Sequence, residues 1–140
     1  MYKEIKLALN PYFENNRENK KIRLLFRANS QSIYQQKVVI QGPHGVNIEG
    51  VSTGNQGGGQ FIDKVIEIDF TPSEAMIYTI QVEHRYANEA PWEPSVVKGG
   101  SYSVINSMYM AYALGNDGGN DLDFADSIVE IIAVDGTPKA

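Results

Sequence analysis

The sequence predicts an all-β protein, an antiparallel β-sandwich of about eight to nine strands in a single domain that spans residues 1–140. Two observations predict this class. Apolar and polar residues alternate along most of the chain, which is the period of a strand with one buried face. Segments rich in Gly, Pro and Asn interrupt these runs about every eight to twelve residues, a spacing typical of sandwiches and barrels. No segment has a convincing helical period.

The candidate strands follow one another along the whole chain. In "KIRLLFRAN", for example, Ile22, Leu24 and Phe26 share one face, as the two-residue period of a strand requires. The predicted strands cover residues 2–9, 21–29, 34–42, 64–70, 75–86, 101–114 and 126–134. The predicted turns are "NPYFENNREN", "GPHG", "STGNQGGGQ", "TPSE", "NEAPWEPS", "KGG" and "GNDGGND".

Composition excludes several functional classes. Hydrophobic residues make up 42% of the chain and charged residues 21%, which indicates a globular protein. The net charge of −5 argues against a nucleic-acid-binding surface and a polybasic membrane patch. The absence of cysteine excludes disulfides and thiolate metal sites. No apolar run approaches the ~18 residues of a membrane span.

The amino-terminal segment "MYKEIKLALNPYF" has alternating charges and no continuous apolar core. It therefore does not fit a secretory signal peptide. We expect cytoplasmic synthesis, and action outside the cell would need release by a route other than a cleaved signal.

An acidic cluster near the carboxyl terminus points to a candidate metal site. Asp117, Asp121, Asp123 and Asp126 lie within ten residues, mixed with Asn and Gly. Convergent oxygen donors on a short loop suit Ca²⁺, which takes six to eight oxygen ligands in irregular geometry. The same residues are also good turn formers, so a solvated acidic loop between two strands explains the composition equally well. The EF-hand pattern does not fit, because it requires Gly at loop position six and Glu at position twelve.

The segment "DGGNDLDFADSIVEI" resembles the carboxyl-terminal signature of the two-calcium fucose- and mannose-binding bacterial lectins, the fucose-binding lectin II family. In that signature an Asp-Gly pair precedes Asp-x-Asp-Tyr-Asn-Asp and a β-branched strand. Asp121, Asp123 and Asp126 match its three aspartates, and Phe124 stands for the Tyr. Asp117 matches the preceding Asp. The resemblance covers roughly residues 20–136.

A second matching segment lies far away in the sequence. "FRANSQS" resembles the family segment that supplies one more calcium ligand, which places Asn29 as that ligand. Ser30, Gln31 and Ser32 match the short loop that selects the sugar. The full set of metal ligands implied by the resemblance is Asn29, Asn116, Asp117, Asp121, Asp123 and Asp126. The implied sugar-contacting residues are Ser30, Gln31, Ser32, Asp117, Asp121 and Asp123.

The resemblance implies a calcium-dependent lectin that binds a monosaccharide or glycan of fucose or mannose type through one or two Ca²⁺ ions. It implies recognition without catalysis. It also implies a homodimer or tetramer in which the carboxyl-terminal strand forms the interface. The apolar run "DSIVEIIAV" would be hazardous as a bare sheet edge, which favours the same assembly. Asp135 and Gly136 would belong to the tail that reaches the site of the partner subunit.

Three positions depart from the family pattern. Asn116 replaces an acidic ligand, Ala125 replaces an Asn ligand, and "TPKA" follows Gly136, where family members end. These departures keep a second function open. In that alternative the chain is a structural or assembly β-sandwich of lectin-like fold, with one or no calcium ion and no sugar binding.

Three further residues could belong to sites but fit structural roles better. Trp92 could stack on a sugar ring, or it could cover an edge of the core. His44 and His84 have no partner at the spacing of a metal site or a catalytic triad. No segment pairs a nucleophile with a base, so we expect no enzymatic activity.

Overall fold

The structure is a computed structural model that describes residues 4–9, 20–54, 59–70, 76–105, 108–117 and 126–135. Within these ranges the chain forms β-strands and no helix. The strands are β1 (Glu4–Leu9), β2 (Lys20–Asn29), β3 (Gln35–Gln41), β4 (Asn47–Val51), β5 (Gln60–Phe70), β6 (Met76–Arg85), β7 (Glu93–Pro94), β8 (Val96–Ile105), β9 (Met108–Asn116) and β10 (Ser127–Asp135). The described residues therefore include no helix that could cross a membrane.

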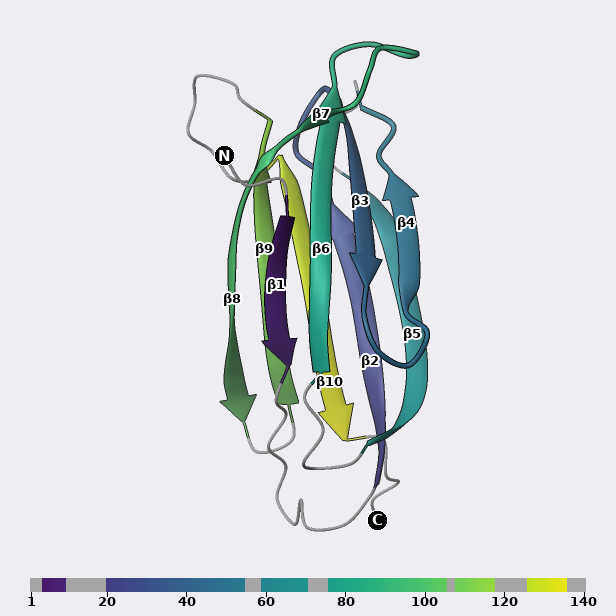
Figure 1. Cartoon of the computed structure of the whole chain (residues 1–140), viewed down its shortest axis with the longest axis vertical. Helices are drawn as coiled ribbons and strands as arrows, with labels where there is room; N and C mark the ends of the chain where they lie inside the picture. The colour runs from purple at the N-terminus through teal and green to yellow at the C-terminus, as the bar shows by residue number, and fades with distance from the viewer. Residues whose placement is uncertain are drawn as a thin grey trace.

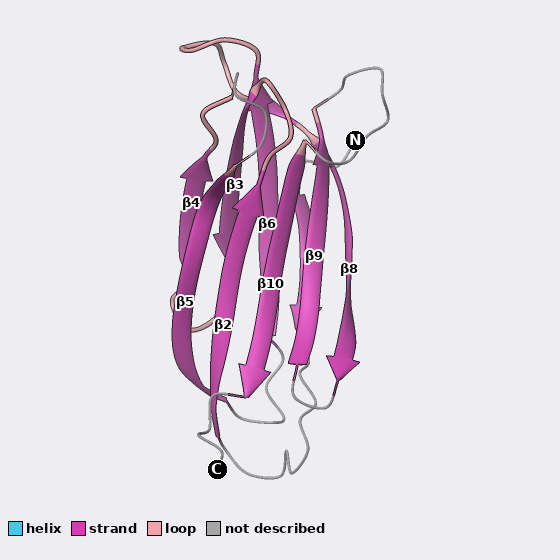
Figure 2. Cartoon of the chain, turned by 180° about the vertical axis from the view of Figure 1, so that it is seen from behind, coloured by secondary structure: helices cyan, strands magenta, loops and turns pink. Residues whose placement is uncertain are grey.

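Two antiparallel sheets pack face to face, as Figures 1 and 2 show from opposite sides. One sheet has the order β1-β6-β3-β4, with β7 paired to the end of β6. The other has the order β5-β2-β10-β9-β8. The predicted all-β antiparallel sandwich is thus confirmed. The two-residue β7, the short β4 and the division of one predicted strand into two raise the number of strands above the expected eight to nine.

The core lies between the two sheets and follows the predicted alternation. Ile22, Leu24 and Phe26 of β2 are fully buried on one face. From the opposite sheet, Tyr78 meets Phe26 edge to face, with ring centroids 5.9 Å apart. Burial of each such side chain contributes about 1.5–3 kcal/mol of transfer free energy. The alternation of apolar residues therefore fixes which face of each strand turns inward.

The region predicted as one strand over residues 101–114 contains parts of two strands, β8 and β9, which pair antiparallel. The prediction was wrong because Asn106 and Ser107, both common turn residues, were included in an alternating run. The predicted turn "KGG" lies inside β8. A Cβ atom at Gly99 would collide with the backbone carbonyl oxygen of Tyr112. This glycine therefore permits close approach of two strands instead of a turn.

Strand β10 lies in the middle of its sheet, between β2 and β9. It was expected to be hazardous as a bare edge, and that reasoning was wrong because both of its edges are paired. Its outward residues, Ile128, Ile132 and Val134, are half-buried on the outer face of the sheet. Any apolar surface that β10 offers to a partner is therefore a sheet face.

Candidate functional site

Antiparallel pairing brings the two sequence motifs to the same end of the sandwich, the upper end in Figure 1. Strand β2 ends at Asn29, whose register partner on β10 is Ile128. Ser127, the first residue of β10, pairs with Gly115 near the end of β9. The loop that follows β2 and the chain between β9 and β10 therefore start from adjacent strand ends. This adjacency is what the two separated motifs predicted.

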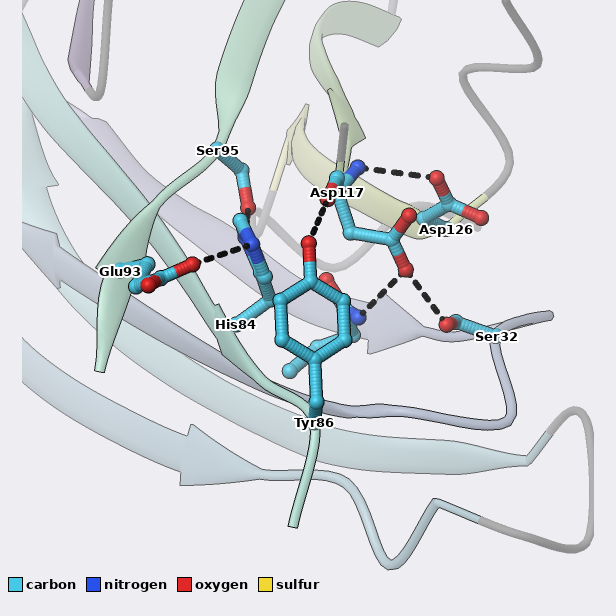
Figure 3. A network of polar contacts seen from close by, with 8 residues as sticks. Ser32, His84, Tyr86, Glu93, Ser95, Asp117 and Asp126 are labelled. Carbon is cyan, nitrogen blue, oxygen red and sulfur yellow. Dashed lines mark hydrogen bonds and ion pairs between the residues drawn. The ribbon is translucent and has the colours of Figure 1, made fainter. Parts of the chain in front are cut away.

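Asp117 is the centre of a polar network at this end (Figure 3). The Ser32 hydroxyl donates a hydrogen bond of 2.7 Å to Asp117 Oδ2, and Gln36 Nε2 donates one of 3.4 Å to the same oxygen. The Tyr86 hydroxyl donates to the Asp117 backbone oxygen at 3.0 Å. Asp117 is only 4% exposed. Ser32 and Gln36 thus fix the buried Asp117 carboxylate, and Tyr86 fixes its backbone oxygen.

Asp126 lies against Asp117. The Asp117 backbone N–H donates to Asp126 Oδ2 at 2.9 Å, and Asp126 is also buried. Ser127, the next residue, donates from its hydroxyl to Gln36 Oε1 at 3.0 Å. Because Gln36 donates through its nitrogen to Asp117 and accepts through its oxygen from Ser127, both partners fix the orientation of its amide. Gln36 therefore connects the two sides of the acidic segment.

The electrostatics of this end favour a cation. Asp117 has hydroxyl, amide and phenol donors as partners among the described residues, and all of them are neutral. A buried carboxylate without an opposite charge costs free energy even when it is hydrogen-bonded. A second carboxylate, Asp126, lies against Asp117 and adds negative charge there. The carboxylate oxygens of Asp117 and Asp126 are the kind of ligand that Ca²⁺ prefers, so these residues fit this ion in type.

The described residues supply only part of a calcium site. In the part of the chain that the structure describes, no three Asp, Glu or His side chains gather into a group suited to a metal. Asp121, Asp123 and Gly136 lie outside the described residues, so the predicted proximity of Asn29 to Asp123 stays a prediction. Asn116, at the end of β9, is buried beside Asp117.

The remaining predicted site residues divide between the two ends of the sandwich. Ser30 is buried, and its hydroxyl accepts the Ser32 backbone N–H at 3.0 Å, whereas Gln31 is exposed. Asn29 is half-buried. Asp135 ends β10, eight residues beyond Ser127, which corresponds to about 26 Å along a strand. Within its own chain, Asp135 is therefore remote from Asp117 and Asp126.

Several residues of the network were not predicted from the sequence. Gln36 shares the inward face of β3 with Val38 and Ile40 and is fully buried. A glutamine at an inward position of an alternating strand was a signal that could have identified it, because a buried amide needs polar partners. Tyr86 gave no such signal. It follows β6, and only the tertiary structure brings its hydroxyl to Asp117.

His84 belongs to a second polar group beside Tyr86 (Figure 3). Its Nδ1 lies 2.8 Å from Ser95 Oγ, and its Nε2 lies 3.6 Å from the Glu93 carboxylate. Its ring meets Tyr86 edge to face. Because Ser95 and His84 are both buried, a substrate would not reach either side chain. The group supports Tyr86 structurally, while His44 is exposed in the turn between β3 and β4.

Two small cavities flank the loop that follows β2. One, of about 80 Å³, is lined by Ser30, Ser32, Thr53 and Phe61 among others. The second, of about 110 Å³, is lined in part by Tyr34, Thr53 and Tyr86. Thr53 lines both cavities. The polar network of Asp117 therefore lies beside concave surface that could take a small polar ligand.

We compared the sequence and the fold with those of known proteins. No protein-family model matches the sequence, and no curated protein matches it. Solved structures of bacterial lectins share its fold, and three of them are described next. The lectin CV2L from Chromobacterium violaceum, solved with α-methyl-fucoside, has a TM-score of 0.55 and 18% identity and covers 95% of this chain and 96% of its own.

The high-affinity mannose-binding lectin from Ralstonia solanacearum has a TM-score of 0.52 and 13% identity, with 95% of this chain and 96% of its own covered. The C-terminal domain of the BC2L-C lectin from Burkholderia cenocepacia has a TM-score of 0.51 and 16% identity, with 98% and 99% covered. The fold predicted from the two motifs is confirmed: this chain has the β-sandwich fold of these bacterial lectins.

Proposed function

We propose that the protein is a calcium-dependent, non-catalytic carbohydrate-binding protein for sugars of fucose or mannose type. One observation carries the proposal. Ser32, in the segment that resembles the sugar-selecting loop, donates directly to Asp117 at the start of the acidic segment, although 85 residues separate them. Support also comes from the fold shared with lectins, one of them bound to a fucoside and another described as mannose-binding.

In this proposal each residue has a definite part. Asp117 and Asp126 hold the cation, and Ser32, Gln36 and the Asp117 backbone N–H orient their carboxylates. Gln31 and the surface next to Ser30 contact the sugar. When bound, Ca²⁺ supplies positive charge and open coordination positions for vicinal hydroxyls. Hydrogen bonds from those hydroxyls to carboxylates are charge-assisted and therefore strong.

A second candidate function, a structural β-sandwich that binds no sugar, is favoured by the burial of this network. Asp117 and Asp126 are 4% and 7% exposed. Oδ2 of Asp117 already accepts two hydrogen bonds from the protein, and Ala125 lacks the oxygen found at the matching family position. In this candidate the network closes the end of the sandwich without a metal.

Sugar titration distinguishes the two candidates. In Ca²⁺ we expect methyl α-fucoside or methyl α-mannoside to bind with a dissociation constant near 1 mM, or about −4 kcal/mol. Calorimetry in excess chelator should show no binding, because the hydroxyls then lose their cation. Ala125→Asn should strengthen binding by restoring an oxygen donor.

The control for this titration is Ile77→Asn, which introduces the same residue at an exposed position near the opposite end of β6. It should bind like the wild type. Absence of heat with both sugars, in protein shown to be loaded with calcium, would support the structural candidate.

We further propose a homodimer that buries the outer face of the sheet β5-β2-β10-β9-β8. Val65, Leu25, Ile132 and Met110 form one row across four strands, as their register partners show. Val65 is 57% exposed. A two-fold axis parallel to this face and perpendicular to its strands would set the Asp135 end of β10 in one chain beside the site end of the other. That arrangement would bring Asp135 of the second copy toward Asp117, which it cannot approach within one chain.

Replacing one residue of this row tests the dimer. Ile132→Lys should convert the protein to 15.5 kDa monomers in light scattering, because a buried lysine at a sheet-to-sheet contact is costly. Ile77→Lys changes an exposed isoleucine on the other sheet and should leave the dimer intact. A wild-type protein that stays monomeric at high concentration would refute the assembly.

A further inference from the structure

The second cavity, of about 110 Å³, lies beside the candidate sugar site. Tyr34, Arg85 and Tyr86 line it, and Thr53 lines both this cavity and the one next to Ser30 and Ser32. The Tyr86 hydroxyl reaches the backbone of Asp117. A ligand with two linked units could therefore occupy both cavities at once, one unit on each side of Thr53.

Two tyrosine rings contribute to the wall of this cavity. The rings of Tyr34 and Tyr86 meet edge to face, with centroids 4.6 Å apart and an interplanar angle of 85°. Tyr86 is 52% exposed and Ile33 is 59% exposed. The bond to Asp117 and the contact with His84 fix the Tyr86 ring. Exposed apolar faces that are already ordered bind the C–H face of a sugar ring at low entropic cost.

Burial of the Tyr86 hydroxyl, with the Asp117 carboxylate nearby, raises its pKa above the ordinary value of a tyrosine. Its hydroxyl donates to the Asp117 backbone oxygen at 3.0 Å, so Tyr86 links the cavity to the Asp117 network.

Arg85 adds a positive charge to the wall. Its Nε donates to Gln35 Oε1 at 2.6 Å, and its guanidinium carbon lies 4.3 Å from the centre of the Trp92 ring. Lys37 contacts the same ring but is paired with Glu83 at 3.7 Å. Among the described ion pairs, none involves Arg85. Gln35 and Trp92 orient the Arg85 guanidinium. Its terminal N–H groups can therefore donate to an anionic ligand.

A fixed guanidinium that has no carboxylate partner among the described residues is unusual in a chain with a net charge of −5. Such a group binds a planar carboxylate through two parallel hydrogen bonds. Its position beside two tyrosine rings combines recognition of an anion with recognition of a sugar face. Neither feature is needed for a neutral monosaccharide at the Asp117 end.

We propose that the cavity of Tyr34, Arg85 and Tyr86 is a second saccharide subsite, which binds a carboxylate-bearing sugar unit of uronic acid type next to the neutral sugar. The inference rests on the proposed function in taking the natural ligand to be a glycan. The subsite itself uses no metal. Arg85 recognises the carboxylate, and Tyr34, Tyr86 and Ile33 contact the sugar ring.

Trp92, the single tryptophan of the chain, provides the readout because Arg85 stacks on it. Titration with methyl β-glucuronide should change its fluorescence and saturate, with and without chelator. Methyl β-glucoside, the neutral counterpart, should bind at least tenfold more weakly. Arg85→Gln should lower the glucuronide affinity to that of the glucoside. Arg85→Lys keeps the charge but loses the planar guanidinium, so its glucuronide affinity should lie between those of the wild type and Arg85→Gln.

Three controls complete the experiment. Calorimetry repeats each titration, because the Arg85 variants alter the tryptophan environment themselves. Arg23→Gln removes an equal charge from the other sheet, where Arg23 lies 3.9 Å from Glu67, and should bind like the wild type. Acetate should bind much more weakly than the glucuronide.

Equal affinity for glucuronide and glucoside, or for acetate and glucuronide, would overturn the proposal. So would an unchanged glucuronide affinity in Arg85→Gln. Fucoside binding, measured in parallel, separates this proposal from the first. Its absence alongside intact glucuronide binding would contradict calcium-dependent recognition and support the subsite.

Discussion

Calcium should raise the melting temperature of the chelated protein by roughly 8 °C at a hundredfold excess over its dissociation constant. An ion that binds only the folded state stabilises it by about 2.7 kcal/mol at that concentration. For a chain of this size, each kcal/mol corresponds to roughly 3 °C. The physical origin is the acidic segment, in which Asp117 and Asp126 are buried together and the described donors to the Asp117 carboxylate are neutral. Calorimetric scans with calcium and with chelator measure the shift.

Two controls make this result specific. Magnesium should stabilise much less, because it demands smaller, near-octahedral geometry and gives up water reluctantly. Asp63→Asn removes a carboxylate from an exposed position of β5 and should leave the calcium response unchanged. Identical melting curves in calcium and in chelator would remove the metal from the proposed function and leave the structural sandwich.

Replacement of Asp117 should have the largest effect of any single change at the site, and two variants separate its two roles. Asp117→Ala removes the acceptor of Ser32 and Gln36. The Ser32 hydroxyl loses its acceptor, and Gln36 Nε2 keeps only the Tyr34 backbone oxygen at 3.3 Å. This should destabilise the protein by about 1–3 kcal/mol even in chelator. Urea denaturation monitored by Trp92 fluorescence measures this loss.

Asp117→Asn keeps the size of the side chain and one acceptor oxygen but removes the charge. In chelator its stability should lie within about 1 kcal/mol of the wild type, because one hydrogen-bonded acceptor remains. Its stabilisation by calcium should be largely lost. The metal-free structural candidate makes the opposite prediction, in which calcium changes the stability of neither protein. An Asp117→Asn variant that responds to calcium like the wild type would show that Asp117 is not a ligand.

The sequence by itself determined the fold class and indicated that its two separated motifs lie at the same end of the sandwich. Alternation placed Ile22, Leu24 and Phe26 in the core correctly, because the side-chain period of a strand is local and the burial of one face fixes it. The motifs around Asn29 and Asp126 indicated contact between distant segments, and the strand register brought them together. The roles of Asp121 and Asp123 as metal ligands stay predictions.

Only the tertiary structure decided which strands lie at edges and which residues support the site. The apolar run of β10 reads the same at an edge and in the middle of a sheet, so its interior place depended on pairing with β2 and β9. Gln36, Tyr86 and Arg85 acquired their roles from neighbours far away in sequence. Hydrogen bonds and cavities depend on the directions of side chains from several strands at once. A local sequence pattern contains no information about those other strands.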